Sequence, residues 1–347
     1  MRHWVEQRWY QANPGALAAL TPLEQLFRRQ VQRRGRPLRG REFGVPVMVV
    51  GNLTVGGSGK SPVVATLARW LQKQGVSVGI VSRGYGGKAP SYPWPVTAQS
   101  DPVEAGDEPV MLAQQTGCPV FVAPKRAEAV KALVSAHPVQ LILSDDGLQH
   151  QALAREIEWV IVDGQRGLGN GHCLPVGPLR EPAARLSTVD AVLLNGGRSA
   201  ACDHPELTSA LPFSLAISQW RRGDGVVQKS CPFLPGQSVH ALAGIGHPQR
   251  FFDQLTQLGL AVTPHPKADH AVLTQADLQA EPELPWIMTA KDAVKLRHQL
   301  NAQHWVMDIE AVLPEALMTA FSQQLQQLGV SLHWGRSDEH TGPHPAE

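Results

Sequence analysis

A glycine-rich segment at residues 54–61, Thr-Val-Gly-Gly-Ser-Gly-Lys-Ser, constrains the fold of this chain more than any other feature. It follows an apolar run at 45–50, which predicts a buried strand, and precedes a helical pattern over 61–74. Small residues here let backbone N–H groups surround a phosphate at the N-terminus of the helix. The segment therefore favours a P-loop, in which Lys60 reaches the β- and γ-phosphates of a nucleotide and the Ser61 hydroxyl binds Mg²⁺.

One residue of the segment departs from the usual motif, because Thr54 stands where G-x-x-x-x-G-K-[ST] has its first glycine. A glycine-rich turn that happens to join a strand to a helix is the alternative explanation. The strand and helix patterns on either side favour nucleotide binding. The residues predicted to contact the nucleotide are Thr54, Val55, Gly56, Gly57, Ser58, Gly59, Lys60 and Ser61.

A second apolar run, Leu-Ile-Leu-Ser at 141–144, ends in the paired carboxylates of Asp145 and Asp146. This pattern is typical of a Walker B strand, in which an aspartate holds Mg²⁺. Gln149 and His150 follow closely and are expected to point toward the same crevice. An Asp-Asp-Gly sequence alone would indicate an ordinary tight turn, but after a strand of a P-loop protein it predicts a metal site.

Strand and helix patterns alternate from residue 45 to about residue 194. Such alternation predicts an α/β fold with a P-loop NTPase-like, mostly parallel sheet that helices cover on both faces. The alternation breaks at 220–236, and a second, smaller α/β unit is expected after it. The predicted organisation is an N-terminal helical segment at 1–41, a P-loop core domain at 42–219, a linker or short ribbon at 220–236, and a C-terminal α/β domain at 237–347.

Three further segments carry candidate functional residues. Asp107 and Glu108 precede a helical pattern, where acidic residues are favoured by capping and the helix dipole without any catalysis. A long loop ends in Arg180 and Glu181, whose side chains suit contacts with phosphates or ring hydroxyls. His247 lies in a turn that enters a helix, where a lone histidine is usually a capping group.

The charge of the chain is distributed unevenly. The net charge is +1, but residues 1–41 hold nine arginines and two glutamates, a balance of +7, so the rest carries −6. A helix predicted from residue 21 to about residue 35 places Leu23, Leu26, Phe27 and Val31 on one stripe beside Arg28, Arg29, Arg33 and Arg34. Helices that lie on an anionic membrane surface combine these residue types. A helix packed on its own domain, with a solvated basic edge, is the alternative.

Composition excludes several other classes of protein. The four cysteines lie far apart, which argues against a zinc ribbon or a disulfide scaffold and favours a reducing compartment. No apolar run follows Met1 as in a signal peptide, and none reaches the roughly 18 residues of a membrane span. No RNA- or DNA-binding signature accompanies the basic N-terminus, so nucleic acid is not expected as a partner.

Taken together, the segments resemble those of the tetraacyldisaccharide 4′-kinase, or lipid A 4′-kinase, family over nearly the whole chain. They are, in order, the aromatic and basic N-terminus, TVGGSGKSP, VSRGYGG, GDEP, SDDGLQH, LPVGPLREP, GIGHPQRFF and MTAKDAVK. Each segment alone is weak evidence, but their common order is highly specific. In that family the first P-loop position is Ser or Thr, which accounts for Thr54.

The resemblance implies an enzyme that uses ATP and Mg²⁺ to phosphorylate the 4′-hydroxyl of a lipid A precursor, tetraacyldisaccharide 1-phosphate, giving lipid IVA. It implies peripheral attachment to the cytoplasmic face of the inner membrane of Gram-negative bacteria, with no obligate protein partner. Asp107 matches the catalytic acid-base position, and His247 matches a histidine that orients this aspartate from the other domain. The remaining matches to the family's active-site cleft are Glu108, Arg126, Gln149, His150, Arg180 and Glu181.

Three matters stay open at the level of the sequence. A membrane-associated ATPase switch is the first alternative, although the P-loop lacks the second lysine of that class. A nucleotide-binding scaffold without chemistry is the second, although it would not need an acid at position 107. The family often has Glu where this chain has Ala290, which leaves the role of the segment 289–292 undetermined.

Overall fold

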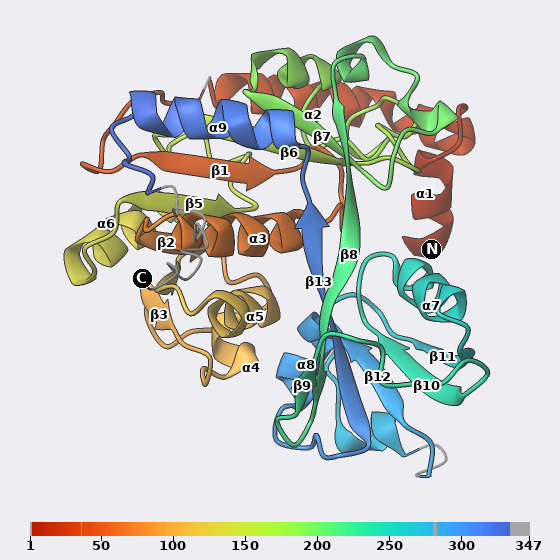
Figure 1. The fold of residues 1–347 in the computed structure, drawn as a ribbon. Helices are drawn as coiled ribbons and strands as arrows, with labels where there is room; N and C mark the ends of the chain where they lie inside the picture. The colour runs from red at the N-terminus through yellow and green to blue at the C-terminus, as the bar shows by residue number, and fades with distance from the viewer. Residues whose placement is uncertain (1, 36, 280–282, 334–347) are drawn as a thin grey trace, which may run out of the picture.

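The computed structural model describes residues 2–35, 37–279 and 283–333, and its strands form one path of hydrogen-bonded neighbours. The path runs β11-β10-β12-β13-β8-β7-β6-β1-β5-β2-β4-β3, and β9 pairs with β8. Two sheets share β8 and give the molecule a larger and a smaller lobe (Figure 1).

The larger lobe contains the P-loop strand at the centre of a mostly parallel sheet, as the sequence predicts. Only β3 runs antiparallel, against β4. Its strands are β1 Val47–Gly51, β2 Val78–Ser82, β3 Trp94–Val96, β4 Val120–Val122, β5 Leu141–Asp145, β6 Ile157–Asp163, β7 Ala191–Asn195 and the first part of β8 Leu211–Arg222.

Helices cover both faces of this sheet, which is why its strands are continuously apolar. On β1, Met48 and Val50 pack in one hydrophobic cluster, whereas Val47 and Val49 pack in the other. Helices α3 Lys60–Lys73, α5 Asp107–Thr116 and α9 Glu315–Gln327 contribute to the first cluster, and α6 Arg126–Ala136 contributes to the second. The short α4, Pro102–Ala105, precedes α5.

The smaller lobe is a second parallel sheet that β8 joins antiparallel at one edge. Its elements are β9 Val227–Gln228, β10 Ser238–Ala243, α7 Pro248–Gln257, β11 Ala261–Pro266, β12 Trp286–Thr289, α8 Ala290–Leu296 and β13 His304–Val312.

Short 3₁₀ helices lie between these elements in several parts of the chain: η1 Gly15–Leu20, η2 Ala183–Thr188, η3 Ala200–Cys202, η4 Pro205–Leu207 and η5 Gln275–Leu278.

Strand β8 connects the lobes and has no counterpart in the predicted elements. The start of β8 pairs with β7, and the remaining length of β8 pairs with β13. Strands β8 and β13 therefore run side by side from one lobe to the other (Figure 1). The stretch 220–236 holds the end of β8 and all of β9, which pair antiparallel.

The predicted C-terminal domain at 237–347, of which 280–282 and 334–347 lie outside the described residues, includes a helix that packs on the larger lobe. Helix α9 leaves the smaller lobe and packs on the sheet of the larger one (Figure 1). Its Phe321 ring lies 5.0 Å from the ring of Trp159 on β6 and 5.9 Å from that of Trp70 on α3. An apolar helix face is buried wherever a sheet face is open, whichever domain precedes it in sequence.

The N-terminal segment forms α1 Arg2–Trp9, η1 and α2 Thr21–Arg33. The predicted apolar stripe of α2 is buried only in part. Val31 is buried and Phe27 packs on the core of the larger lobe, but Leu23 and Leu26 are 52% and 59% exposed. Within the described residues, no helix combines the length and the apolar character that crossing a membrane requires.

Candidate active site

The P-loop connects β1 to α3, and two asparagines hold its backbone. The Asn52 side chain donates to the carbonyl of Gly56 at 3.1 Å, and the Asn195 side chain donates to the carbonyl of Ser58 at 3.0 Å. Gly59 has φ +96°, and a Cβ there would lie 2.6 Å from the Asn195 Nδ2. Only glycine fits this position, so the glycine-rich sequence is a requirement of the loop.

The Walker B carboxylates lie at the end of β5, with Asp145 as its last residue and Asp146 directly after it, beside the start of α3. The Ser61 hydroxyl donates to Asp145 Oδ2 at 3.2 Å. Lys60 Nζ lies 3.7 Å from Asp146 Oδ1, and Arg180 donates to Asp146 Oδ2 at 3.2 Å. The structure therefore brings together the four side chains predicted for the phosphate and metal site and adds Arg180, which was predicted to bind the substrate.

The two aspartates differ in pKa because different charges surround them. Burial raises the pKa of Asp145 to about 7, and the nearby negative charge of Glu108 adds to this effect. Burial also acts on Asp146, but Lys60 and Arg180 outweigh it and lower the pKa of that carboxyl well below its ordinary value. Positive charge therefore compensates for burial at Asp146, whereas at Asp145 the charge of Lys60 does not outweigh burial.

These residues fit a magnesium ion. Oδ1 of Asp145 and Oδ1 of Asp146 are buried and make no hydrogen bond. Mg²⁺ is bound in kinase sites by one or two carboxylates together with substrate phosphates. Carboxylate and hydroxyl oxygens of Ser61, Asp145 and Asp146 provide these ligand types beside Lys60.

Asp107 begins α5 and is 5% exposed. The N-cap of this helix is Gly106, so Asp107 is not the capping residue that the simplest interpretation of the sequence suggests. Its two carboxylate oxygens lie 3.2 and 3.1 Å from Nδ1 of His270, which comes from the smaller lobe. Burial raises the pKa of Asp107, but the His270 hydrogen bond and the charge of Lys291 outweigh it and leave the pKa lowered.

The structure does not pair His247 with Asp107, although the resemblance implied that pairing. His247 is the residue before α7, and in the described residues no hydrogen bond or ion pair joins it to Asp107. Burial lowers its pKa, followed by the charges of Arg166 and Arg250. His270 lies at Asp107 instead, because the loop after β11 reaches α5.

The other predicted cleft residues form two groups. The Gln149 side chain donates to Glu181 at 3.0 Å, so these two hold each other. Arg126 is buried, donates to the Ala123 carbonyl at 2.8 Å, and leaves its Nε without a partner. Burial and the charge of Arg126 lower the pKa of His150 to about 4, so its imidazole is neutral at neutral pH.

Comparisons with known proteins show the family to which this chain belongs. The sequence model of the family described as LpxK, tetraacyldisaccharide-1-P 4′-kinase, matches residues 16–326. The chain belongs to this family. The tetraacyldisaccharide 4′-kinase of Pseudomonas putida (strain W619) is 48% identical over 92% of this chain and 95% of its own length. That of Azotobacter vinelandii is 48% identical over 93% and 96%.

A solved structure agrees as well. LpxK from Aquifex aeolicus, crystallised in complex with ATP, matches with a TM-score of 0.72 and 25% identity over 90% of this chain and 99% of its own. The predicted α/β class, the kinase activity and the use of ATP are therefore confirmed for this member of the LpxK family. It is an ATP-dependent kinase of lipid A biosynthesis.

Four residues that the structure places around Asp107 are absent from the predicted site residues. They are Asp269, His270, Lys291 and Lys295. One signal was available: a polar Asp-His pair follows β11, and ligands gather where parallel strands end. His247 follows the neighbouring strand β10 and has the same signal, so the pattern alone could not choose between them.

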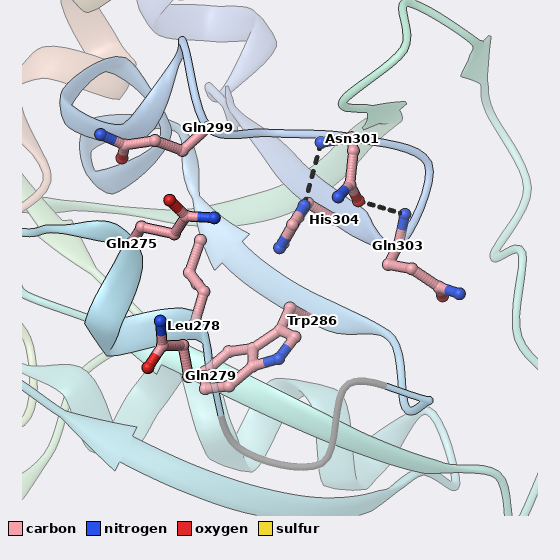
Figure 2. Close-up of a pocket in the computed structure, with 8 residues that line it drawn as sticks. All are labelled: Gln275, Leu278, Gln279, Trp286, Gln299, Asn301, Gln303 and His304. Carbon is pink, nitrogen blue, oxygen red and sulfur yellow. Dashed lines mark hydrogen bonds between the residues drawn. The ribbon is translucent and has the colours of Figure 1, made fainter.

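A separate cavity of about 440 Å³ lies in the smaller lobe (Figure 2). Figure 2 shows amide side chains around it, together with Trp286 and His304. None of the predicted site residues lines it, so it is not the site of phosphoryl transfer.

Proposed function

We propose that this chain transfers the γ-phosphoryl group of ATP to the 4′-hydroxyl of tetraacyldisaccharide 1-phosphate, and that Asp107 accepts the hydroxyl proton. The supporting observation is a buried carboxylate on the larger lobe that a histidine of the smaller lobe holds at 3.1 Å. The negative charge of the neighbouring Glu108 raises the pKa of Asp145, which supports a start of α5 close to the P-loop site.

The chemistry follows from the groups present. A sugar hydroxyl has a pKa far above 7, so a carboxylate that takes its proton late in the transfer lowers the barrier. The bond between the acceptor oxygen and the γ-phosphorus forms as the bond to the bridging oxygen of ADP breaks. The proton ends on Asp107, whose carboxylate His270 keeps in position.

The phosphoryl group itself needs positioning and neutralisation of charge. Lys60 is proposed to contact the phosphates, and Ser61, Asp145 and Asp146 to hold Mg²⁺. When bound, Mg²⁺ neutralises the charge that develops on the phosphate oxygens. The unpartnered Nε of Arg126 supports a further contact with an anionic group of the substrate.

The two lobes are proposed to act as the walls of the cleft. Arg250 of α7 donates to Asp163, at the end of β6, at 2.6 Å. Gly246 approaches the P-loop so closely that a Cβ there would lie 2.8 Å from the Gly57 nitrogen. A closed cleft excludes water, which limits wasteful hydrolysis of ATP.

The N-terminal segment is proposed to hold the enzyme on the anionic cytoplasmic surface of the inner membrane. Leu23 and Leu26 are exposed on α2, and Arg28, Arg29, Arg33 and Arg34 are exposed along the same helix. A lipid acceptor cannot leave a bilayer cheaply, since each exposed CH₂ costs roughly 0.8 kcal/mol. An enzyme for such an acceptor must work at the surface.

The test is Asp107→Asn in the full-length enzyme, assayed with ATP, Mg²⁺ and the purified disaccharide 1-phosphate. Asn keeps the shape of the side chain but cannot take a proton, so kcat should fall by about 10²–10⁴. ATP binding, measured by titration calorimetry, should change little because the P-loop is intact.

Two results would contradict the proposal. Near-normal turnover by the Asn variant, with ATP bound normally, would remove Asp107 from the chemistry. ATP turnover by the unaltered enzyme that ignores the disaccharide and responds to a protein partner would favour the ATPase switch instead.

A further inference from the structure

Helix α8 of the smaller lobe presents two lysines, Lys291 and Lys295, to the start of α5 in the larger lobe. Residues four apart lie on the same face of a helix, so both side chains leave α8 in one direction. They reach the carboxylates of Asp107, Glu108 and Asp269. The family resemblance left the role of the segment 289–292 undetermined, and the contacts of α8 suggest a role for it.

Lys295 is fixed between two carboxylates. Its Nζ lies 3.1 Å from Asp292 Oδ1 and 3.6 Å from Asp107 Oδ2, and its side chain is 9% exposed. Asp292 is fully buried and accepts hydrogen bonds from the Gly244 backbone at 2.9 Å and the Thr289 hydroxyl at 2.7 Å. The Asp292 carboxylate accepts from Gly244, Thr289 and Lys295 itself, so it fixes the position of the Lys295 ammonium group.

Lys291 contacts His270, the second residue of the smaller lobe that lies at Asp107. Its Nζ lies 3.1 Å from Glu108, 2.8 Å from Asp269 and 3.3 Å from His270 Nε2. An ammonium group has donors only, so the contact with Nε2 requires a lone pair on that nitrogen. In the neutral imidazole the proton then sits on Nδ1, where it is donated to Asp107.

We propose that Lys295, anchored by Asp292, is a positioning residue that holds the Asp107 carboxylate ionised and oriented for the acceptor hydroxyl. The inference rests on the proposed role of Asp107. The physical reason is that a buried carboxylate retains its charge only when positive groups and hydrogen bonds compensate for lost water. Because Lys295 belongs to the smaller lobe, Asp107 is complete only when the two lobes meet.

The test is Lys295→Met in the full-length enzyme, which keeps the length of the side chain and removes its charge. We expect kcat to fall on the order of 10²-fold, because a misplaced reacting group costs about this much. The KM for ATP should stay within about twofold of the value for the unaltered enzyme. The matched control is Lys131→Met on α6, which removes a lysine–carboxylate pair of similar length, 3.7 Å to Glu42, and should leave kcat unchanged.

A double-mutant cycle with Asp107→Asn separates positioning from a structural role. If Lys295 acts through Asp107, adding Lys295→Met to the Asn variant causes little further loss, whereas independent effects multiply. An equal loss in both backgrounds, or a normal kcat for the single Met variant, would overturn the inference. Should the Met variant not fold, Lys295→Gln takes its place in the same cycle.

Failure of the proposed function gives a different result. In that case Asp107→Asn alone is nearly as active as the unaltered enzyme, and the Lys295 inference falls with it. If Asp107→Asn is severely impaired and only the Lys295 variants behave normally, the role of Asp107 stands and the positioning role of Lys295 is refuted.

Discussion

The imidazole of His270 bridges both oxygens of the Asp107 carboxylate, with Nδ1 3.2 Å from Oδ1 and 3.1 Å from Oδ2. The aspartate begins a helix of the larger lobe, and the histidine follows a strand of the smaller lobe, 163 residues later in the chain. The proposed base is therefore assembled from both lobes.

The first prediction concerns this pair. His270→Ala should lower kcat by about 10²-fold, because the carboxylate loses its orienting donor. The effect should be less than multiplicative with Asp107→Asn, since the two groups act together. His247→Ala should show no such coupling to Asp107. Steady-state kcat for the single and double variants decides between the two histidines.

The second prediction concerns the titration of His270. Its hydrogen bond to Asp107 raises the pKa of His270 above the ordinary value, although burial and Lys291 oppose this. A raised pKa in the folded state gives stability that is present below the ordinary pKa near 6.5 and is lost as the pH rises through the folded pKa. The loss of stability on His270→Gln should thus be larger at pH 6 than at pH 9 in denaturant unfolding. An equal loss at both values would contradict the charge interaction.

The third prediction concerns Lys60. Lys60→Ala should lower kcat/KM by at least about 10³, or roughly 4 kcal/mol, because the transferring phosphate loses a neutralising charge. Lys73→Ala is the control, since Lys73 lies at the exposed far end of the same helix. A folded Lys60 variant with more than about a tenth of the activity would remove Lys60 from the site.

The fourth prediction concerns the membrane. Replacing Arg28, Arg29, Arg33 and Arg34 with Gln should weaken binding to anionic vesicles by about 1 kcal/mol per charge near the surface. Co-sedimentation with vesicles at low salt measures this. Lys125→Gln with Lys131→Gln, two exposed charges at the N-cap of α6 and on that helix, provides the control. Unchanged sedimentation of the arginine variant would make α2 a packing element only.

The fifth prediction concerns α9. Phe321→Ala should lower the free energy of unfolding by about 3–5 kcal/mol, because it opens a cavity against Trp159 in the core of the larger lobe. Leu234→Ala, at an exposed position, should change it by no more than about 0.5 kcal/mol. Urea unfolding of both variants tests whether this last helix stabilises the larger lobe.

The sequence by itself determined the parts of the site that are continuous along the chain. A strand, a glycine-rich loop and a helix with Lys60 and Ser61 form a P-loop through neighbouring residues alone. Asp145 and Asp146 end a strand that pairs directly with the P-loop strand, so their place follows from local pattern and sheet topology. These features depend on backbone geometry within a few residues.

Only the tertiary structure decided which groups surround Asp107. His247 and His270 follow two neighbouring parallel strands, β10 and β11, and their local patterns are equivalent. Which one reaches α5 depends on how the smaller lobe sits against the larger one, and β8 and β13 set that arrangement. The position of α9 on the larger lobe also depends on tertiary packing, because its apolar face is buried against a sheet that is distant in sequence. Contacts between distant segments depend on the packing of whole elements, which no local pattern encodes.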